Sequence, residues 1–106
     1  MNNYATLELL DWQKDFLMTL ENSTKLIVNL YGDSVGKTWM SHYINKHCPH
    51  IMIIHDNDKP SLEDFIRNRM EITMMNNPSI KKFLVVSIEP IRSDIFDLEN
   101  YEAKLK

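Results

Sequence analysis

The sequence contains very little glycine and cysteine. It has 106 residues, of which 2 are glycines, Gly32 and Gly36, and 1 is a cysteine, Cys48. A single cysteine excludes an internal disulfide, so the chain fits a reducing, intracellular compartment. Glycine supplies positive φ angles and allows close approach of the backbone, at an entropic cost. Because both glycines fall within one short segment, we expect a specific backbone requirement there.

Long apolar runs and excess positive charge are also missing. No apolar stretch approaches the ~18 residues that a membrane helix needs, and the N-terminus lacks the basic-then-apolar pattern of a secretion signal. We therefore expect no membrane partner. The formal net charge of −3 argues against a protein that coats nucleic acid through bulk positive charge. Any nucleic-acid contact must come from a few local lysines, or from a ring of copies that concentrates them.

Helical and strand patterns alternate along the chain. Apolar residues at helical spacing, and short apolar runs, define the elements. The predicted helices are Leu9–Glu21, ended by Asn22-Ser23; Lys37–His47; a helix from Ser61 to the Asn76-Asn77-Pro78 stop; and the tail Leu98–Lys106. The predicted strands are Lys25–Tyr31, Ile51–Ile54 and Phe83–Ile88, with a turn at Asp56–Pro60. This order implies a parallel sheet with helices on both faces.

A phosphate-binding loop is predicted between the first strand and the second helix. The segment from Tyr31 to Thr38 reads YGDSVGKT, and a strand before it with a helix after it is the context that a P-loop requires. Backbone N–H groups of such a loop surround phosphates, and the following helix points its positive end at them. The predicted nucleotide-binding residues are Gly32, Asp33, Ser34, Val35, Gly36, Lys37, Thr38 and Trp39.

The residues at the end of this loop have separate roles. Gly36 lets the backbone approach closely, Lys37 would reach the β and γ oxygens, and Thr38 would give its hydroxyl to Mg²⁺. The segment matches the P-loop pattern fully at Gly-Lys-Thr but not before it. In that pattern, four residues separate a first glycine from the Gly-Lys pair. Here Tyr31 occupies the position of that first glycine, and Gly32 comes one residue late. The alternative is a glycine turn before a helix, with a chance lysine and threonine.

The predicted catalytic pair is Lys37 and Glu89. P-loop enzymes need a carboxylate beside the phosphate loop to hold the Mg²⁺ shell or polarise the attacking water, and it normally ends a buried strand. Glu89 follows the third apolar run, so it is predicted to be this acid and, with Thr38, a metal ligand. The alternative is an exposed acid at a strand end. Nearby, Arg92 could reach phosphate or a neighbouring subunit, or could be a solvated loop arginine.

Three segments together resemble a known family. They are LDWQKDFLMTLE, LIVNLYGDSVGKTWMSHYI and LVVSIEPIRSDIFDLENYEAKLK. They are similar to the helicase region of replication-associated proteins of small circular single-stranded-DNA viruses, which belong to the superfamily-three helicases, an AAA+-type ATPase group. The matching features are Trp12-Gln13 in the leading helix, GKTW at Gly36–Trp39, Glu89–Ser93 at the end of the Walker B strand, and Tyr101-Glu102 with Lys104 and Lys106. The family usually has an aspartate at the position that Glu89 occupies here.

The resemblance implies a fold and an activity. The fold is an α/β domain over residues 1–106, a three-layer, P-loop NTPase-type parallel sheet flanked by helices and incomplete at its C-terminus. Its leading helix occupies residues 1–23 and its nucleotide-binding core residues 24–106. The activity is ATP hydrolysis with ATP and Mg²⁺, coupled to unwinding in a homo-oligomeric ring. The partner would be single-stranded nucleic acid, DNA in preference to RNA, in the host nucleus.

The sequence differs from the family pattern in two respects, which keep other functions open. The family's sensor asparagine and arginine finger would come after Lys106, and no His-x-His pair of a nicking domain is present. One alternative is therefore a truncated nucleotide-binding module without turnover. Another is a small P-loop kinase, which would need a lid with arginines that clamp phosphates. The segment His47–His50 suggests a metal site, but zinc needs about four ligands and no second cluster is evident.

Overall fold

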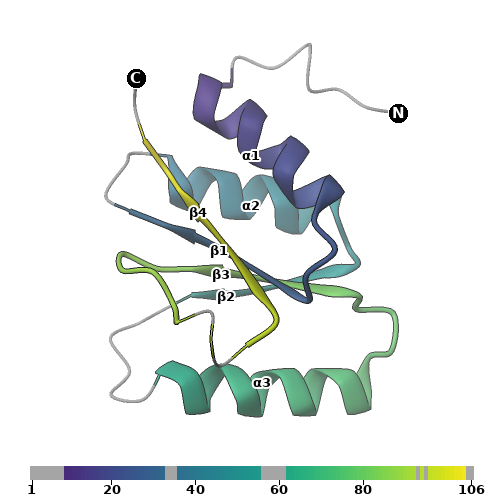
Figure 1. Ribbon diagram of the computed structural model, residues 1–106. Coiled ribbons are helices and arrows are strands. Elements are labelled where there is room, and N and C mark those ends of the chain that lie inside the picture. Colours follow the sequence, from purple (N-terminus) through teal and green to yellow (C-terminus); the bar gives the residue numbers. More distant parts are fainter. Residues whose placement is uncertain (1–8, 33–35, 56–61, 93, 95, 105–106) are drawn as a thin grey trace.

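The computed structural model describes residues 9–32, 36–55, 62–92, 94 and 96–104 (Figure 1). The elements are α1 Asp11–Asn22, β1 Ile27–Tyr31, α2 Lys37–His47, β2 Ile51–His55, α3 Leu62–Asn76, β3 Lys82–Val86 and β4 Leu98–Glu102. Three predicted helices and three predicted strands are confirmed as α1 to α3 and β1 to β3, with ends that differ by at most two residues. The turn predicted at Asp56–Pro60 lies outside the described residues.

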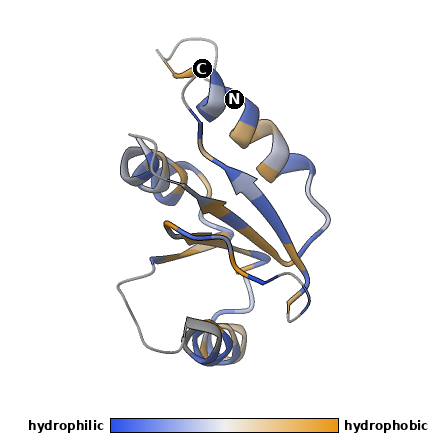
Figure 2. Cartoon of the chain, turned by 60° about the vertical axis from the view of Figure 1, so that its left-hand side comes forward, coloured by the Kyte–Doolittle hydropathy of each residue, from blue (hydrophilic) through white to orange (hydrophobic). Residues whose placement is uncertain are grey.

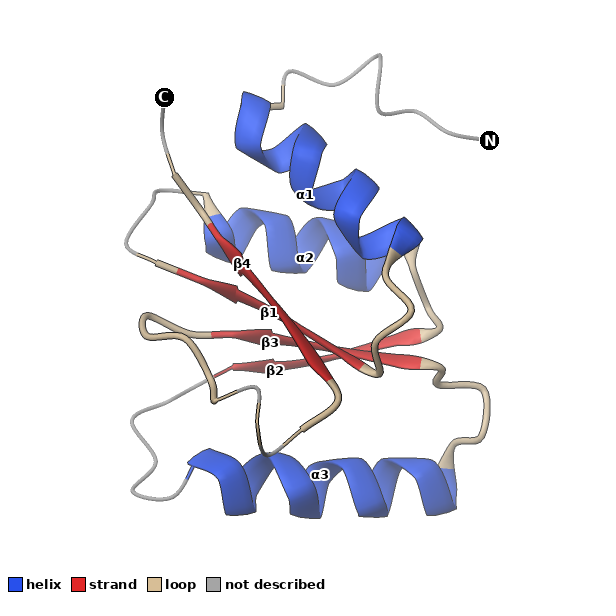
Figure 3. Ribbon diagram, in the orientation of Figure 1, coloured by secondary structure: helices blue, strands red, loops and turns tan. Residues whose placement is uncertain are grey.

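The strands form one parallel sheet. Their order is β2-β3-β1-β4, and every neighbouring pair is parallel. Helices α1 and α2 cover one face and α3 covers the other, which gives three layers (Figures 1 and 3). The α/β class with a parallel sheet flanked by helices is therefore confirmed. The order places the ends of β1 and β3 side by side, because Leu30 pairs with Val86.

Each strand divides its side chains between two hydrophobic clusters, as a period of two requires. In β1, Ile27 belongs to the cluster on the α3 side, whereas Val28 and Leu30 belong to the cluster on the α1 and α2 side. Hydrophobic residues accordingly gather on the strands between the helical layers (Figure 2). The side chains buried most completely are Phe16, Phe83, Leu17, Ile27, Leu30, Met40, Ile44, Ile54, Ile66, Leu84, Val28 and Val85.

The helix predicted for the tail is wrong. Leu98–Glu102 is strand β4, which pairs along the whole of β1. The pairing extends beyond both ends, because Ile27 N donates to Asp97 O at 3.1 Å and Ala103 N donates to Tyr31 O at 2.8 Å. Without β4, the N–H and C=O groups on this side of β1 would lack partners. Backbone pairing of this kind outweighs the weak helical propensity that the sequence pattern reflects.

Candidate phosphate-binding site

The loop predicted to bind phosphates lies at the carboxyl end of the sheet, where parallel α/β sheets place their ligands. It leaves β1 after Tyr31 and enters α2 at Lys37. Gly32 has a φ of 114° and Gly36 a φ of 102°, values that glycine adopts without the penalty of a Cβ. Asp33, Ser34 and Val35 lie outside the described residues. The two glycines therefore supply the positive φ angles expected at the ends of the loop.

The Lys37 side chain joins this loop to the end of β3. Its Nζ donates to the carbonyl oxygen of Gly32 and to that of Ser87, the second at 2.8 Å. Gly32 N in turn donates to Ile88 O at 3.0 Å. The structure thus brings Lys37 and Gly32 together with the residues that follow β3, which are 50 positions away from Lys37 in sequence.

Thr38 and Trp39 occupy the first turn of α2 and are both exposed. Trp39 retains 48% of its surface, and its indole stacks on the Tyr43 ring with centroids 5.4 Å apart and planes 20° apart. The Thr38 carbonyl accepts a hydrogen bond of 2.7 Å from the Ser41 hydroxyl. The Thr38 residue and about half of the Trp39 surface are therefore exposed beside the loop.

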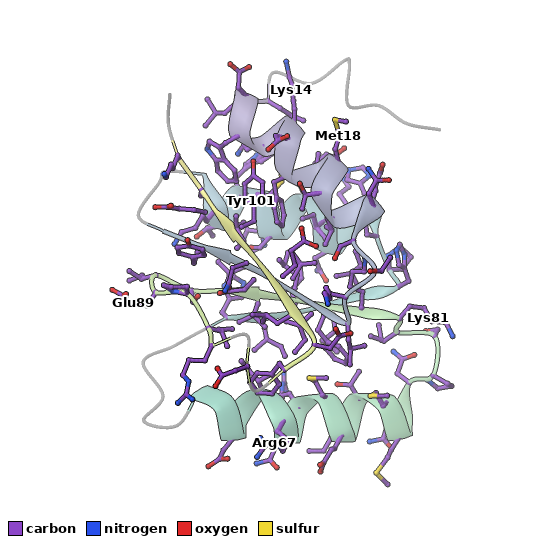
Figure 4. All side chains as sticks on the ribbon, in the orientation of Figure 1. Lys14, Met18, Arg67, Lys81, Glu89 and Tyr101 are labelled. Carbon is purple, nitrogen blue, oxygen red and sulfur yellow. The ribbon has the colours of Figure 1, made fainter. Side chains whose placement is uncertain are left out.

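Glu89 lies farther from the strand than predicted. Strand β3 ends at Val86, and Glu89 is exposed in the bend that follows, with its side chain directed away from the molecule (Figure 4). The residue directly after the strand, Ser87, is 4% exposed and accepts the Lys37 hydrogen bond at its carbonyl. The Ser87 hydroxyl donates to the Glu89 carbonyl at 2.7 Å. Glu89 is thus tied to the Lys37 contact through its backbone, while its carboxylate faces solvent.

A buried amide that the sequence analysis did not single out fixes this bend. Asn29 of β1 is fully buried, and its Nδ2 donates to Val85 O at 2.9 Å and to Ser87 Oγ at 3.0 Å. Its Oδ1 accepts from Ile91 N at 2.9 Å. Asn100 of β4 donates to Ile91 O at 3.0 Å. The only sequence signal was one amide inside the apolar run LIVNLY.

The first turn of α1 packs against the other end of the loop. Gln13 is 4% exposed; its Oε1 accepts from Leu10 N at 2.9 Å, and its Nε2 donates to Gly36 O at 3.3 Å. A Cβ on Gly36 would lie 2.8 Å from Gln13 Nε2, and a Cβ on Gly32 would lie 3.1 Å from the Ala103 carbonyl oxygen. Both positions are therefore tightly packed, and the positive φ angles are the stronger reason for glycine at each.

Arg92 is held on its own loop. Its Nη2 lies 2.9 Å from Asp94 Oδ2, and both side chains are largely exposed. The hydrogen bond from Arg92 lowers the pKa of the Asp94 carboxyl. Of the two roles considered for Arg92, this geometry favours the solvated loop arginine.

His55 is a second residue at this edge of the sheet that the sequence analysis did not identify. It ends β2, and its Nε2 lies 3.4 Å from Ser41 Oγ, one turn beyond Thr38. Burial and, to a smaller extent, His42 lower the pKa of His55. The neutral form of the imidazole is therefore favoured, and the ring links the end of β2 to the first turns of α2.

Comparison of the chain with protein-family models, with characterised proteins and with solved structures gave no match. Within the described part of the chain, no helix has the length and apolar character needed to cross a membrane.

Proposed function

We propose that this chain binds a Mg²⁺–nucleoside triphosphate at the loop between β1 and α2 and hydrolyses ATP as the motor module of a replication helicase. The observation that carries the proposal is the position of the Lys37 ammonium. It bridges Gly32 and Ser87 at the carboxyl end of the sheet, beside the N-terminus of α2. A cation, a helix N-terminus and two glycines of positive φ at one point form a site for a phosphate group.

The proposed roles follow from where the side chains lie. Lys37 exchanges its carbonyl partners for oxygens of the β and γ phosphates, with which its charge pairs more strongly. The exposed ring of Trp39, already stacked on Tyr43, offers its other face to the nucleotide base. Glu89 is exposed in the bend after β3, and its side chain points outward (Figure 4). On nucleotide binding it turns towards the γ phosphate, orients the attacking water and accepts its proton as ADP leaves.

The donor set is compatible with Mg²⁺. The Thr38 hydroxyl and the Glu89 carboxylate are both exposed, and Mg²⁺ is usually held by one or two protein oxygens together with waters and substrate phosphates. Among the described residues, no group of three or more histidine, cysteine or acidic side chains could hold a metal alone, which fits an ion that arrives with the nucleotide. When bound, Mg²⁺ neutralises charge that develops on the phosphates.

The helicase part of the proposal is supported by sequence resemblance. The stretch from Tyr101 to Lys106 is similar to the start of a family motif near a DNA-contacting loop. In the structure, Lys104 is exposed just after β4, and its Nζ lies 3.3 Å from Glu102 Oε1. We propose that single-stranded DNA, in preference to RNA, is the nucleic-acid partner, and that a ring of copies concentrates these lysines against the overall negative charge.

A second candidate is a small P-loop kinase, which would use the same loop and the same lysine. Strand β1, which precedes the loop, is the direct neighbour of β3, so Lys37 lies beside the end of β3 in either candidate. A kinase would also need a lid with arginines that clamp the phosphates. Arg92 is instead paired with Asp94 on its own loop, so the helicase is preferred. Phosphoryl transfer from ATP to a nucleoside or nucleotide, measured in a coupled assay, would decide for the kinase.

Replacing Glu89 by glutamine is expected to separate binding from hydrolysis. The change removes the proton acceptor and leaves Lys37 intact. We expect ATP turnover to fall about 100-fold or more, while the affinity for Mg²⁺–ATP changes less than about threefold because the proposed binding contacts remain. Phosphate release with and without single-stranded DNA measures the first quantity, and calorimetric titration measures the second.

Glu71→Gln is the matched control, because Glu71 is an exposed glutamate of α3 on the opposite side of the sheet from α2. It should leave both quantities unchanged. For the wild type we expect hydrolysis that single-stranded DNA stimulates. Nucleotide binding without any turnover by the wild type would instead identify a binding module, and a fully active Glu89→Gln would remove Glu89 from the mechanism.

A further inference from the structure

The indole N–H of Trp12 is buried without a hydrogen-bond partner, and it is alone in this among the side chains that the structure describes. Trp12 is 4% exposed. A buried donor of this kind costs about as much free energy as a lost hydrogen bond, and native structures rarely keep one. An unpaired donor beside a proposed ligand site therefore needs an explanation.

The donor belongs to the ring edge that faces the phosphate loop. Trp12 Cζ2 lies 3.5 Å from the position that a Cβ on Gly36 would take, and Cζ2 and Nε1 are bonded to the same ring carbon. The neighbouring residue, Gln13, donates to Gly36 O through a hydrogen bond of 3.3 Å, which is longer than usual. Adjacent positions of α1 thus bring the Gln13 amide onto the Gly36 carbonyl and the edge of the Trp12 ring against Gly36.

The position of α1 is fixed independently of this contact. The Tyr101 hydroxyl of β4 lies 3.2 Å from the Trp12 carbonyl oxygen and 2.5 Å from Asp15 Oδ2. The Phe16 and Tyr101 rings pack edge to face with centroids 5.2 Å apart, and Tyr101 points from β4 towards α1 (Figure 4). Because β4 is itself paired with β1, the first turn of α1 is held over Gly36 by the sheet.

We propose that Trp12 and Gln13 set the geometry of the phosphate loop and respond to the nucleotide. Gln13 is a positioning residue: together with Met40 N, which donates to the same oxygen at 2.9 Å, it holds the Gly36 carbonyl and so directs the backbone N–H of Lys37. The Trp12 indole N–H gains its acceptor from an oxygen of the bound phosphate chain. This inference rests on the proposed phosphate-binding function, and it makes α1 a nucleotide-sensitive part of the site.

Nuclear magnetic resonance of the whole, ¹⁵N-labelled chain tests the inference directly. The sequence has 2 tryptophans, so two indole N–H signals are expected, and Trp39→Phe assigns them by removing one. We expect Mg²⁺–ADP to move the Trp12 signal downfield in a saturable manner, as a new hydrogen bond to an anion requires. Adenosine, which lacks phosphate, should not produce this shift.

Two variants measure the effect on affinity. Trp12→Phe removes the N–H, and Gln13→Glu replaces the donor amide with a carboxylate that repels the Gly36 carbonyl. Each is expected to weaken Mg²⁺–ADP binding about tenfold, the factor that corresponds to one lost hydrogen bond. Lys14→Gln, at an exposed position of the same helix, should bind as the wild type does. Thermal unfolding without nucleotide checks that each variant is folded.

The outcomes separate this inference from the proposed function. If the wild type binds Mg²⁺–ADP and the Trp12 indole signal stays in place, the inference is wrong and the phosphate site stands. Folded variants with wild-type affinity lead to the same conclusion. If the wild type binds no nucleotide at all, the proposed function fails and the inference fails with it. Should a variant not fold, the indole shift in the wild type decides alone.

Discussion

Replacing Lys37 by alanine is expected to lower the affinity for Mg²⁺–ATP by at least about 100-fold, or ~2.7 kcal/mol. The lysine provides the one ammonium that bridges Gly32 and Ser87, and charge-assisted hydrogen bonds to phosphate are about twice as strong as neutral ones. Alanine leaves the backbone N–H groups and the α2 N-terminus, which alone bind phosphate weakly. Isothermal titration calorimetry with Mg²⁺–ATP measures the difference.

Lys46→Ala is the matched control for this experiment. Lys46 lies on the same helix as Lys37 but near its C-terminal end, where it is exposed. It removes the same charge from the chain without touching the loop, so its affinity should stay within about twofold of the wild type. Equal losses in the two variants would mean that the lysines act through general charge. Undiminished binding by Lys37→Ala would remove the lysine from the site.

Replacing Asn29 by alanine is expected to lower the free energy of unfolding by about 3 kcal/mol. The side chain is fully buried and makes three hydrogen bonds, to Val85 O, Ser87 Oγ and Ile91 N. Alanine leaves the Ile91 N–H without this acceptor in the interior and opens a small cavity. For a domain whose total stability is about 5–15 kcal/mol, the loss is large. Urea unfolding followed by circular dichroism measures it.

Asn100→Ala controls for the general effect of removing an asparagine from the sheet. Asn100 is exposed and makes one hydrogen bond, to Ile91 O, so its removal should cost about 1 kcal/mol or less. The Asn29 variant should also bind Mg²⁺–ATP less tightly, because the bend from Ser87 to Ile91 loses its support. Equal stability of the two variants would contradict the role of Asn29 as the buried anchor of that bend.

Much of the fold could be predicted because its signals are local. The helices α1 and α2 repeat apolar residues at helical spacing, and β1 and β3 are short apolar runs that are buried from both sides. The loop between β1 and α2 was predicted in the same way, from two glycines and a lysine placed between a strand and a helix, and its phosphate binding stays a prediction. These features depend on neighbours a few positions away, which a sequence displays directly.

The features that could not be predicted depend on partners far away in sequence. Strand β4 forms because β1 offers an open edge about 70 positions earlier, and its own residues carry a pattern that also suits a helix. The hydrogen-bond partners of the Asn29 side chain lie 56 to 62 positions away in the sequence. Gln13 donates to Gly36, which lies 23 positions away. Glu89 was expected at the strand end, but β3 stops at Val86, which leaves Ser87 beside Lys37.

The most direct test of the phosphate site uses the chain's 2 glycines, whose amide signals fall in a distinct region of a ¹H–¹⁵N correlation spectrum. During titration with Mg²⁺–ATP, the account predicts that the Gly32 and Gly36 amides shift together and saturate with one dissociation constant. That constant should match the one from calorimetry, and Lys37→Ala should abolish both shifts. If Mg²⁺–ATP binds while both glycine amides stay unmoved, the nucleotide occupies another place and the central claim is contradicted.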